Sequence, residues 1–133
     1  MAGWDDLVSF VRMRYEVMRQ ADGELWFNLP TIGDRTQLVV VRRVTGSDGE
    51  LWAQIASPVC RLADADLDEL LALAGESVVG GVVATDGVAL FRHSVPLDDL
   101  APDMTAAGFD RPFRLVVEVA DRLEEHVTGQ DEH

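Results

Sequence analysis

The sequence predicts an α+β fold, a single-domain two-layer sandwich in which helices pack on a mainly antiparallel sheet. Segments with helical spacing of apolar residues stand near both ends and in the middle of the chain, and strand-like segments fill the space between them. The connections between neighbouring strands are short, which favours antiparallel pairing. A length of 133 residues suits one domain with one core. The expected order is α-β-β-β-α-β-β-α.

The first expected helix covers residues 4–18, where apolar side chains recur at steps of three and four. Asp5 and Asp6 fall in its first turn and Arg19 near its last, an arrangement that suits the helix dipole. Residues 21–23 (Ala-Asp-Gly) end it. The apolar stripe consists of Trp4, Leu7, Val8, Val11, Tyr15 and Met18.

Three strands are expected next, over residues 25–29, 36–44 and 51–57. Each is rich in apolar or β-branched residues. Residues 31–34 and 46–49 contain the glycines and aspartates that form turns between them. These three strands therefore form an antiparallel meander.

A short helix is expected over residues 66–74. Asp66 can cap it, with Glu69 three residues later in a pattern close to a capping box. Gly75 follows where a left-handed C-cap would stand. Its apolar stripe consists of Leu67, Leu70, Leu71 and Ala74.

Two further strands are expected over residues 78–84 and 88–93. The Asp-Gly pair at 86–87 between them is a strong hairpin signal. The Gly-Gly pair at 80–81 predicts either a bulge or a close approach of another backbone. Residues 96–100 are expected to form a turn or a short helical piece.

The closing helix is expected over residues 111–128, with Asp110 as N-cap and Pro112 in the first turn. Gly129 stops the helix, so the domain covers residues 1–129 and residues 130–133 form a disordered tail. The apolar stripe of this helix consists of Phe113, Val116, Val117, Ala120, Leu123 and Val127.

The charge is strongly acidic, with 24 acidic against 11 basic residues and a net charge of −13. Nucleic acids and anionic membrane surfaces require clustered cations, so neither is expected as a partner. Every basic residue is an arginine, which excludes a Schiff-base or P-loop lysine. The single cysteine, the lack of a signal peptide and the lack of a long apolar run predict a cytoplasmic protein.

The residues typical of catalytic and metal sites are sparse. His93, His126 and His133 are too far apart to form a local ligand pair, and Cys60 has no second thiol nearby. No metal, cofactor or catalytic residue is therefore expected. Two residues leave an enzymatic alternative open: Cys60, whose neighbour Arg61 could favour its thiolate, and His93.

Aromatic residues offer a different kind of site. Residues 25–27 (Leu-Trp-Phe) place large apolar groups on both faces of one strand, and only one face can belong to the core. Trp26, Trp52 and Phe91 are the predicted anchors for a peptide on the other face. Burial of these rings beneath the first helix is the alternative.

Residues 88–100 (VALFRHSVPLDDL) and 120–124 (ADRLE) give the chain a family resemblance. From Trp4 to Gly129 the chain resembles the YbjN-like family, in particular its actinobacterial members. This family shares the fold of type III secretion chaperones of the CesT class. The resemblance implies a small sandwich with the order given above. Secretion chaperones of this fold are small acidic homodimers without ATPase activity that hold an extended client segment on apolar patches. YbjN-like proteins are linked to regulation and stress, and the resemblance brings no catalytic residues.

The predicted function is that of a non-enzymatic, chaperone-like module that binds a peptide or protein segment on apolar surface as a homodimer. Leu67, Leu70 and Leu71 are the predicted dimer surface, because a two-turn helix so rich in leucine can bury more than one side. One alternative is a regulatory adaptor that binds one folded protein. The other is a small enzyme that uses Cys60 or His93.

Overall fold

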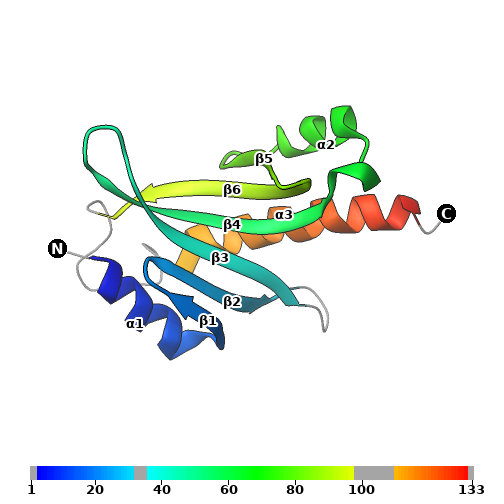
Figure 1. Ribbon diagram of the computed structural model, residues 1–133. Helices are drawn as coiled ribbons and strands as arrows, with labels where there is room; N and C mark the ends of the chain where they lie inside the picture. Colours follow the sequence, from blue (N-terminus) through cyan, green and yellow to red (C-terminus); the bar gives the residue numbers. More distant parts are fainter. Residues whose placement is uncertain (1–2, 32–35, 98–109, 132–133) are drawn as a thin grey trace.

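The computed structural model describes residues 3–31, 36–97 and 110–131, and the side chains of the last helix as far as residue 127. Within these residues, one six-stranded antiparallel sheet has the strand order β1-β2-β3-β4-β6-β5, and three α-helices accompany it (Figure 1). The predicted α+β class is therefore confirmed. The elements are α1 (Trp4–Arg14), β1 (Val17–Ala21), β2 (Glu24–Pro30), β3 (Thr36–Thr45), β4 (Leu51–Arg61), the 3-10 turn η1 (Leu62–Asp64), α2 (Leu67–Ala74), β5 (Gly81–Thr85), β6 (Val88–Pro96) and α3 (Asp110–Asp131).

Strand β1 is the element that the sequence did not predict. The first helix ends at Arg14 instead of continuing to residue 18, and the chain turns directly into the edge strand. Gly23 has a positive φ of 71°, which lets a tight turn join β1 to β2. Met18 fits the helical spacing, yet its side chain is 60% exposed because it lies on this edge strand.

The core lies between one face of the sheet and the helices α1 and α3. Alternate residues of the strands point into it, and the predicted apolar stripe of the closing helix is buried there as expected. Phe27 lies at its centre, stacked on Tyr15 at 5.5 Å between ring centroids and edge-on to Phe113 at 5.7 Å. Figure 1 shows α3 running along the sheet, with α1 near the β1 end and α2 near the β5 end.

Strands β3 and β4 part at one end of the sheet. Their main-chain register ends at Ala56, and Pro58 further along β4 has no N–H to donate. Side chains take over there: Ser57 Oγ donates to the carbonyl of Leu38 at 2.7 Å, and Gln37 Nε2 donates to the carbonyl of Pro58 at 2.7 Å. Two side chains thus hold the strands together where the ladder stops.

Helix α2 begins as predicted and ends differently. The carboxylate of Asp66 accepts a hydrogen bond from the backbone N–H of Glu69 at 3.2 Å, which confirms the N-cap. Gly75 has φ −66° and ψ −15°, so the predicted left-handed C-cap is wrong. His126 of α3 contacts the Glu69 carboxylate at 2.6 Å and ties α2 to the long helix.

The β5–β6 hairpin contains both predicted glycine features. Asp86 and Gly87 have positive φ values of 52° and 80°, typical of a two-residue hairpin turn. Gly80 approaches another part of the chain so closely that a Cβ there would lie 2.7 Å from Cε2 of Phe91. The strand itself begins at Gly81 instead of residue 78, because Gly80 with its φ of 74° is not extended.

The ends of α3 differ from the prediction. Asp110 is the first residue of the helix instead of a cap outside it, and the helix continues past Gly129 to Asp131. The predicted tail at 130–133 and the predicted turns at 31–34 and 96–100 lie partly outside the described residues, and Pro96 belongs to β6. Across residues 3–31, 36–97 and 110–131, no helix is both long and apolar enough to cross a membrane.

Candidate functional site

A shallow hollow of ≈ 210 Å³ lies on the sheet face that points away from the core. All of its described lining residues belong to strands, and none belongs to a helix. We use the word floor for the apolar lining residues and the word rim for the polar and arginine side chains that line the same hollow. The lining residues are Trp26, Leu38, Val40, Arg42, Gln54, Ala56, Pro58, Thr85, Leu90 and Arg92. We call this hollow and its lining the open-face site.

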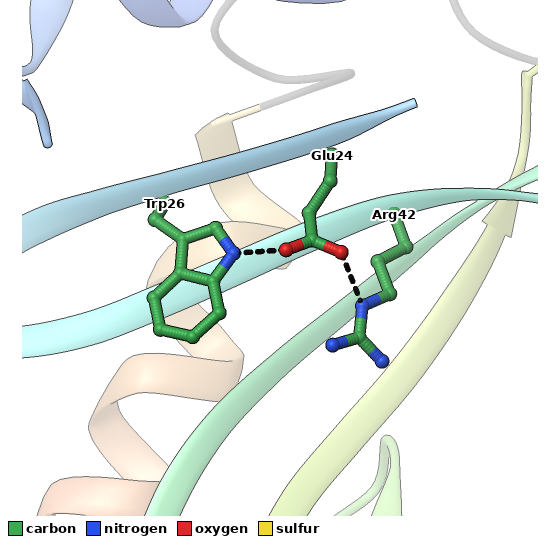
Figure 2. Close-up of polar contacts among 3 residues, drawn as sticks. All are labelled: Glu24, Trp26 and Arg42. Atoms are coloured by element: carbon green, nitrogen blue, oxygen red, sulfur yellow. Dashed lines mark hydrogen bonds and ion pairs between the residues drawn. The ribbon is translucent and has the colours of Figure 1, made fainter. Parts of the chain in front are cut away.

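Trp26 is held in a fixed position at the open-face site. Glu24 and Trp26 are alternate residues of β2 and share a face, and Arg42 of β3 lies directly across from Glu24. The indole N–H of Trp26 donates to one carboxylate oxygen of Glu24, and Nε of Arg42 donates to the other at 3.0 Å (Figure 2). The guanidinium of Arg19 stands 5.5 Å from the centre of the Trp26 ring.

The electrostatics of this group keep Glu24 ionised. The hydrogen bond from Trp26 lowers the pKa of Glu24 below its ordinary value of 4.5, and the positive charge of Arg42 lowers it further against the opposing effect of burial. The anion therefore stays available to hold the indole and the guanidinium. Trp26 is presented in one orientation before any partner arrives, which reduces the entropic cost of binding.

The charge of the open-face site is opposite to that of the whole chain. Arg42 and Arg92 line the hollow, and no carboxylate does so among the described residues. Arg42 is paired with Glu24. Arg92 is exposed, and within the described part of the chain it has no carboxylate partner.

The three predicted anchors have different positions. Trp26 lines the hollow and is partly exposed, so for Trp26 burial beneath the first helix is excluded. Trp52 lies on the same face of β4 but outside the hollow, with its indole N–H so close to Gly46 that a Cβ there would lie 2.9 Å from it. The prediction is wrong for Phe91, whose ring is wholly buried because it points to the helix side of β6.

The three leucines of the predicted dimer surface also differ in their exposure. Leu67 and Leu71 of α2 are 51% and 48% exposed, whereas Leu70 is only 2% exposed. Leu70 packs in the core of its own chain and cannot be a contact between subunits, so the prediction is wrong for this residue. Only Leu67 and Leu71 remain available for a partner.

Cys60, one of the two enzymatic candidates, lines a separate open cavity of ≈ 440 Å³ beside the parted strands, together with Arg61 and Glu124. Arg61 is already paired with Asp64, at 3.1 Å from Nε to the carboxylate. His93 lines none of the three cavities described. In the part of the chain that the structure describes, no three His, Cys, Asp or Glu side chains gather to hold a metal ion.

A third cavity, of ≈ 670 Å³, lies between the end of β2 and one face of α3, and the sequence analysis did not predict it. At its border Tyr15 donates a hydrogen bond to the buried carboxylate of Asp110, and Nε of Arg114 donates to the same carboxylate at 2.5 Å. Among the described residues, three carboxylates and two guanidinium groups line this cavity. Because Tyr15 and Asp110 are separated by 95 positions, no local pattern could have predicted their contact.

The pKa values of Tyr15 and Asp110 are shifted in opposite directions. Burial raises the pKa of Tyr15 to about 12, and the hydrogen bond to Asp110 adds to this effect. Burial alone would raise the pKa of Asp110, but the hydrogen bonds from Tyr15 and Arg114 and the charge of Arg114 together hold it below 3.8. The three groups satisfy one another, which indicates that they connect the end of α1 to the start of α3.

Fold and site together define a small α+β sandwich with helices on one face of its sheet and a preorganised, partly apolar surface on the other. Comparison of the chain with models of known protein families finds no match, and neither does comparison with curated proteins. The function is therefore argued from the geometry of the open-face site.

Proposed function

We propose that this protein is a non-enzymatic, chaperone-like module that binds an apolar peptide or protein segment at the open-face site. The observation that carries this proposal is the position of Trp26, a large aromatic side chain fixed beside apolar residues on a sheet face to which the described helices contribute no lining. Tryptophan is among the residues that dominate binding energies when a partner excludes water from them.

The apolar floor supports the same proposal. Leu38, Val40, Ala56, Pro58 and Leu90 are all partly exposed and line one hollow. Each square ångström of such surface that a partner covers contributes roughly 25 cal/mol. A client segment is therefore attracted by area, while the net charge of −13 keeps the complex soluble.

The proposal includes a homodimer in the cytoplasm, with the exposed Leu67 and Leu71 of α2 at the subunit contact. It also includes the YbjN-like relationship that the sequence motifs imply. Cys60 is the only cysteine and needs no disulfide partner, in keeping with a reducing compartment.

The test is to replace Trp26 and measure binding of fluorescently labelled apolar peptides by anisotropy. Trp26→Ala should weaken binding at least about 30-fold, since loss of a central anchor costs about 2 kcal/mol or more. Leu51→Ala is the matched control, because Leu51 is an exposed apolar residue that does not line the hollow. Equal affinities of Trp26→Ala and the parent protein would overturn the proposal.

The same peptides separate the alternatives. A chaperone-like module binds several unrelated apolar peptides with graded affinity, whereas an adaptor binds none of them and captures one folded protein in fixed stoichiometry. An enzyme that uses Cys60 would show a thiol of unusually high reactivity, measured with iodoacetamide at neutral pH.

A further inference from the structure

The size of the hollow restricts what can occupy it. Its volume of ≈ 210 Å³ is below the roughly 300–1,000 Å³ of pockets that enclose whole small molecules. A hollow of this size suits apolar side chains that project from a larger partner. The partner's remaining groups then lie around the rim of the hollow.

The rim is positively charged in an otherwise acidic chain. Arg42 and Arg92 border the apolar floor, and Arg19 stands over the ring of Trp26. The one carboxylate in this group, Glu24, is already bound by Trp26 and Arg42. Gly81, which lies opposite Arg92 on β5, has no side chain that could cover the guanidinium.

We infer that the segment bound at the open-face site carries a carboxylate next to its apolar anchor, and that Arg92 is the group that binds this carboxylate. The inference rests on the proposed function and specifies the chemistry of its partner: a segment of another polypeptide with apolar side chains and flanking aspartate or glutamate. Because no carboxylate of residues 3–31, 36–97 or 110–127 pairs with Arg92, its guanidinium can form a two-pronged pair with a carboxylate of the partner, whereas Arg42 shares its charge with Glu24.

Charge complementarity favours this partner over a basic one. A lysine or arginine brought to the rim would meet two guanidinium groups and no carboxylate of the described lining. The net charge of −13 attracts basic segments to the protein as a whole. The arginines of the rim repel such segments at the open-face site itself. The open-face site therefore favours segments with acidic flanking residues, although the protein as a whole attracts basic ones.

The experiment compares three peptides of about ten residues with the same alternating leucines and valines, which span roughly 33 Å when extended. The residues between them are glutamate in the first peptide, glutamine in the second and lysine in the third. Anisotropy titrations use the full chain at low and at moderate NaCl concentration. At moderate NaCl concentration, where a screening length of about 8 Å suppresses the effect of the distant acidic surface, the glutamate peptide should bind more tightly than the glutamine peptide.

Variants then assign the effect to Arg92. Arg92→Gln should weaken the glutamate peptide about two- to five-fold, the range of a partly exposed ion pair, and leave the glutamine peptide unchanged. Arg12→Gln is the matched control, because it removes one exposed arginine from α1 and leaves the open-face site intact. That control should bind all three peptides as the parent protein does.

The outcomes are distinguishable. Equal binding of the glutamate and glutamine peptides at moderate NaCl concentration overturns this inference and supports the apolar site alone. Unchanged binding of the glutamate peptide to Arg92→Gln also overturns it. Failure of all three peptides to bind overturns the proposed function. A change of oligomeric state in Arg92→Gln without peptide would mean that a second copy of the chain occupies the hollow, which also overturns the inference.

Discussion

Gly80 shows how a single position can require glycine for two independent reasons. Its φ is 74°, a conformation that side chains with a Cβ rarely adopt, and a Cβ would lie 2.7 Å from the Phe91 ring and 2.8 Å from the carbonyl of Arg92. The Phe91 ring is fully buried, and the Arg92 carbonyl belongs to the backbone of β6. Neither group can shift without disturbing the core or the sheet. The close approach brings β5 against the core.

We expect Gly80→Ala to destabilise the protein by about 1–3 kcal/mol, through backbone strain and overpacking. Gly81→Ala is the control, because a Cβ at Gly81 meets nothing within 4 Å. It should be neutral or stabilise by about 0.5 kcal/mol. Urea unfolding of both variants measures the difference, and a Gly80→Ala variant as stable as the parent would contradict the assignment.

The pair of Tyr15 and Asp110 makes stability depend on pH at both ends of the scale. The pKa of Asp110 is held below 3.8, so its ionised form contributes stability above that pH, and the contribution is lost as the pH falls through the lowered pKa. The pKa of Tyr15 is raised from 10.0 to about 12, so the neutral phenol contributes below pH 10, and this contribution is lost as the pH rises towards 12.

Tyr15→Phe should therefore reduce both pH dependences. At neutral pH it should cost about 1–2 kcal/mol, because the buried carboxylate of Asp110 loses a hydrogen-bond donor. Denaturant unfolding at about pH 3, 7 and 11 measures the effect. If the variant lost as much stability as the parent between pH 7 and 11, the shift assigned to Tyr15 would be wrong.

At the scale of elements, helix α2 has two different faces. Leu70 packs into the core, and Glu69 contacts His126 of α3, whereas Leu67 and Leu71 are about half exposed. The sequence shows one leucine-rich stripe, and only the position of α2 beside β5 and α3 decides which leucine is inside. Substitutions on the two faces of α2 can therefore test its role in folding and its role in subunit association separately.

Leu70→Ala should destabilise the fold by about 2–4 kcal/mol, since it leaves a cavity in the core. Leu67→Ala and Leu71→Ala should each change stability by less than about 0.5 kcal/mol. Under the proposed function, the double variant of Leu67 and Leu71 should shift the protein from dimer to monomer in sedimentation analysis. A double variant with unchanged association would remove α2 from the proposed subunit contact.

The β1–β2 hairpin and the parted strands β3 and β4 are features that strand pairing decides. Tyr15 and Met18 continue the helical spacing of α1, yet the chain leaves the helix at Arg14 because β1 pairs with the edge of β2. Ser57 is a polar residue that is wholly buried, and its hydroxyl replaces a missing ladder bond. Both features depend on pairing with another strand, which the spacing of residues within one segment does not show.

At the scale of the whole molecule, the net charge of −13 works against compactness. The few basic residues are placed unevenly: Arg42 and Arg92 gather at the open-face site, and Arg43 and Asp22 pair at the β1–β2 turn. Unpaired carboxylates elsewhere repel one another. This repulsion is long-ranged at low ionic strength and short-ranged at physiological ionic strength.

The thermal midpoint should therefore rise as NaCl increases from about 0.01 to about 0.15 M, because the screening length falls from about 30 to about 8 Å. Differential scanning calorimetry at several NaCl concentrations measures this. Sucrose, which adds no ions, is the control for general solvent effects. A midpoint that falls with added NaCl would show that attractive pairs outweigh the repulsion.

The sequence by itself determined the fold class, the apolar stripe of the closing helix, the Asp66 cap, the hairpin at 86–87 and the acidic character. These features depend on local spacing, turn chemistry or composition, which the chain carries wherever it folds. It also predicted that residues 25–27 place large apolar groups on both faces of one strand, and it left open whether Trp26 is exposed or buried beneath the first helix.

Only the tertiary structure decided the rest. It placed Phe91 and Leu70 inside, kept Trp26 and Leu67 at the surface, and brought Arg42 and Arg92 from two separate strands to one hollow. Tyr15 meets Asp110 only because α1 and α3 pack on the same face of the sheet. The face that a strand or helix turns to the core depends on what packs against it, and that neighbour is often distant in sequence.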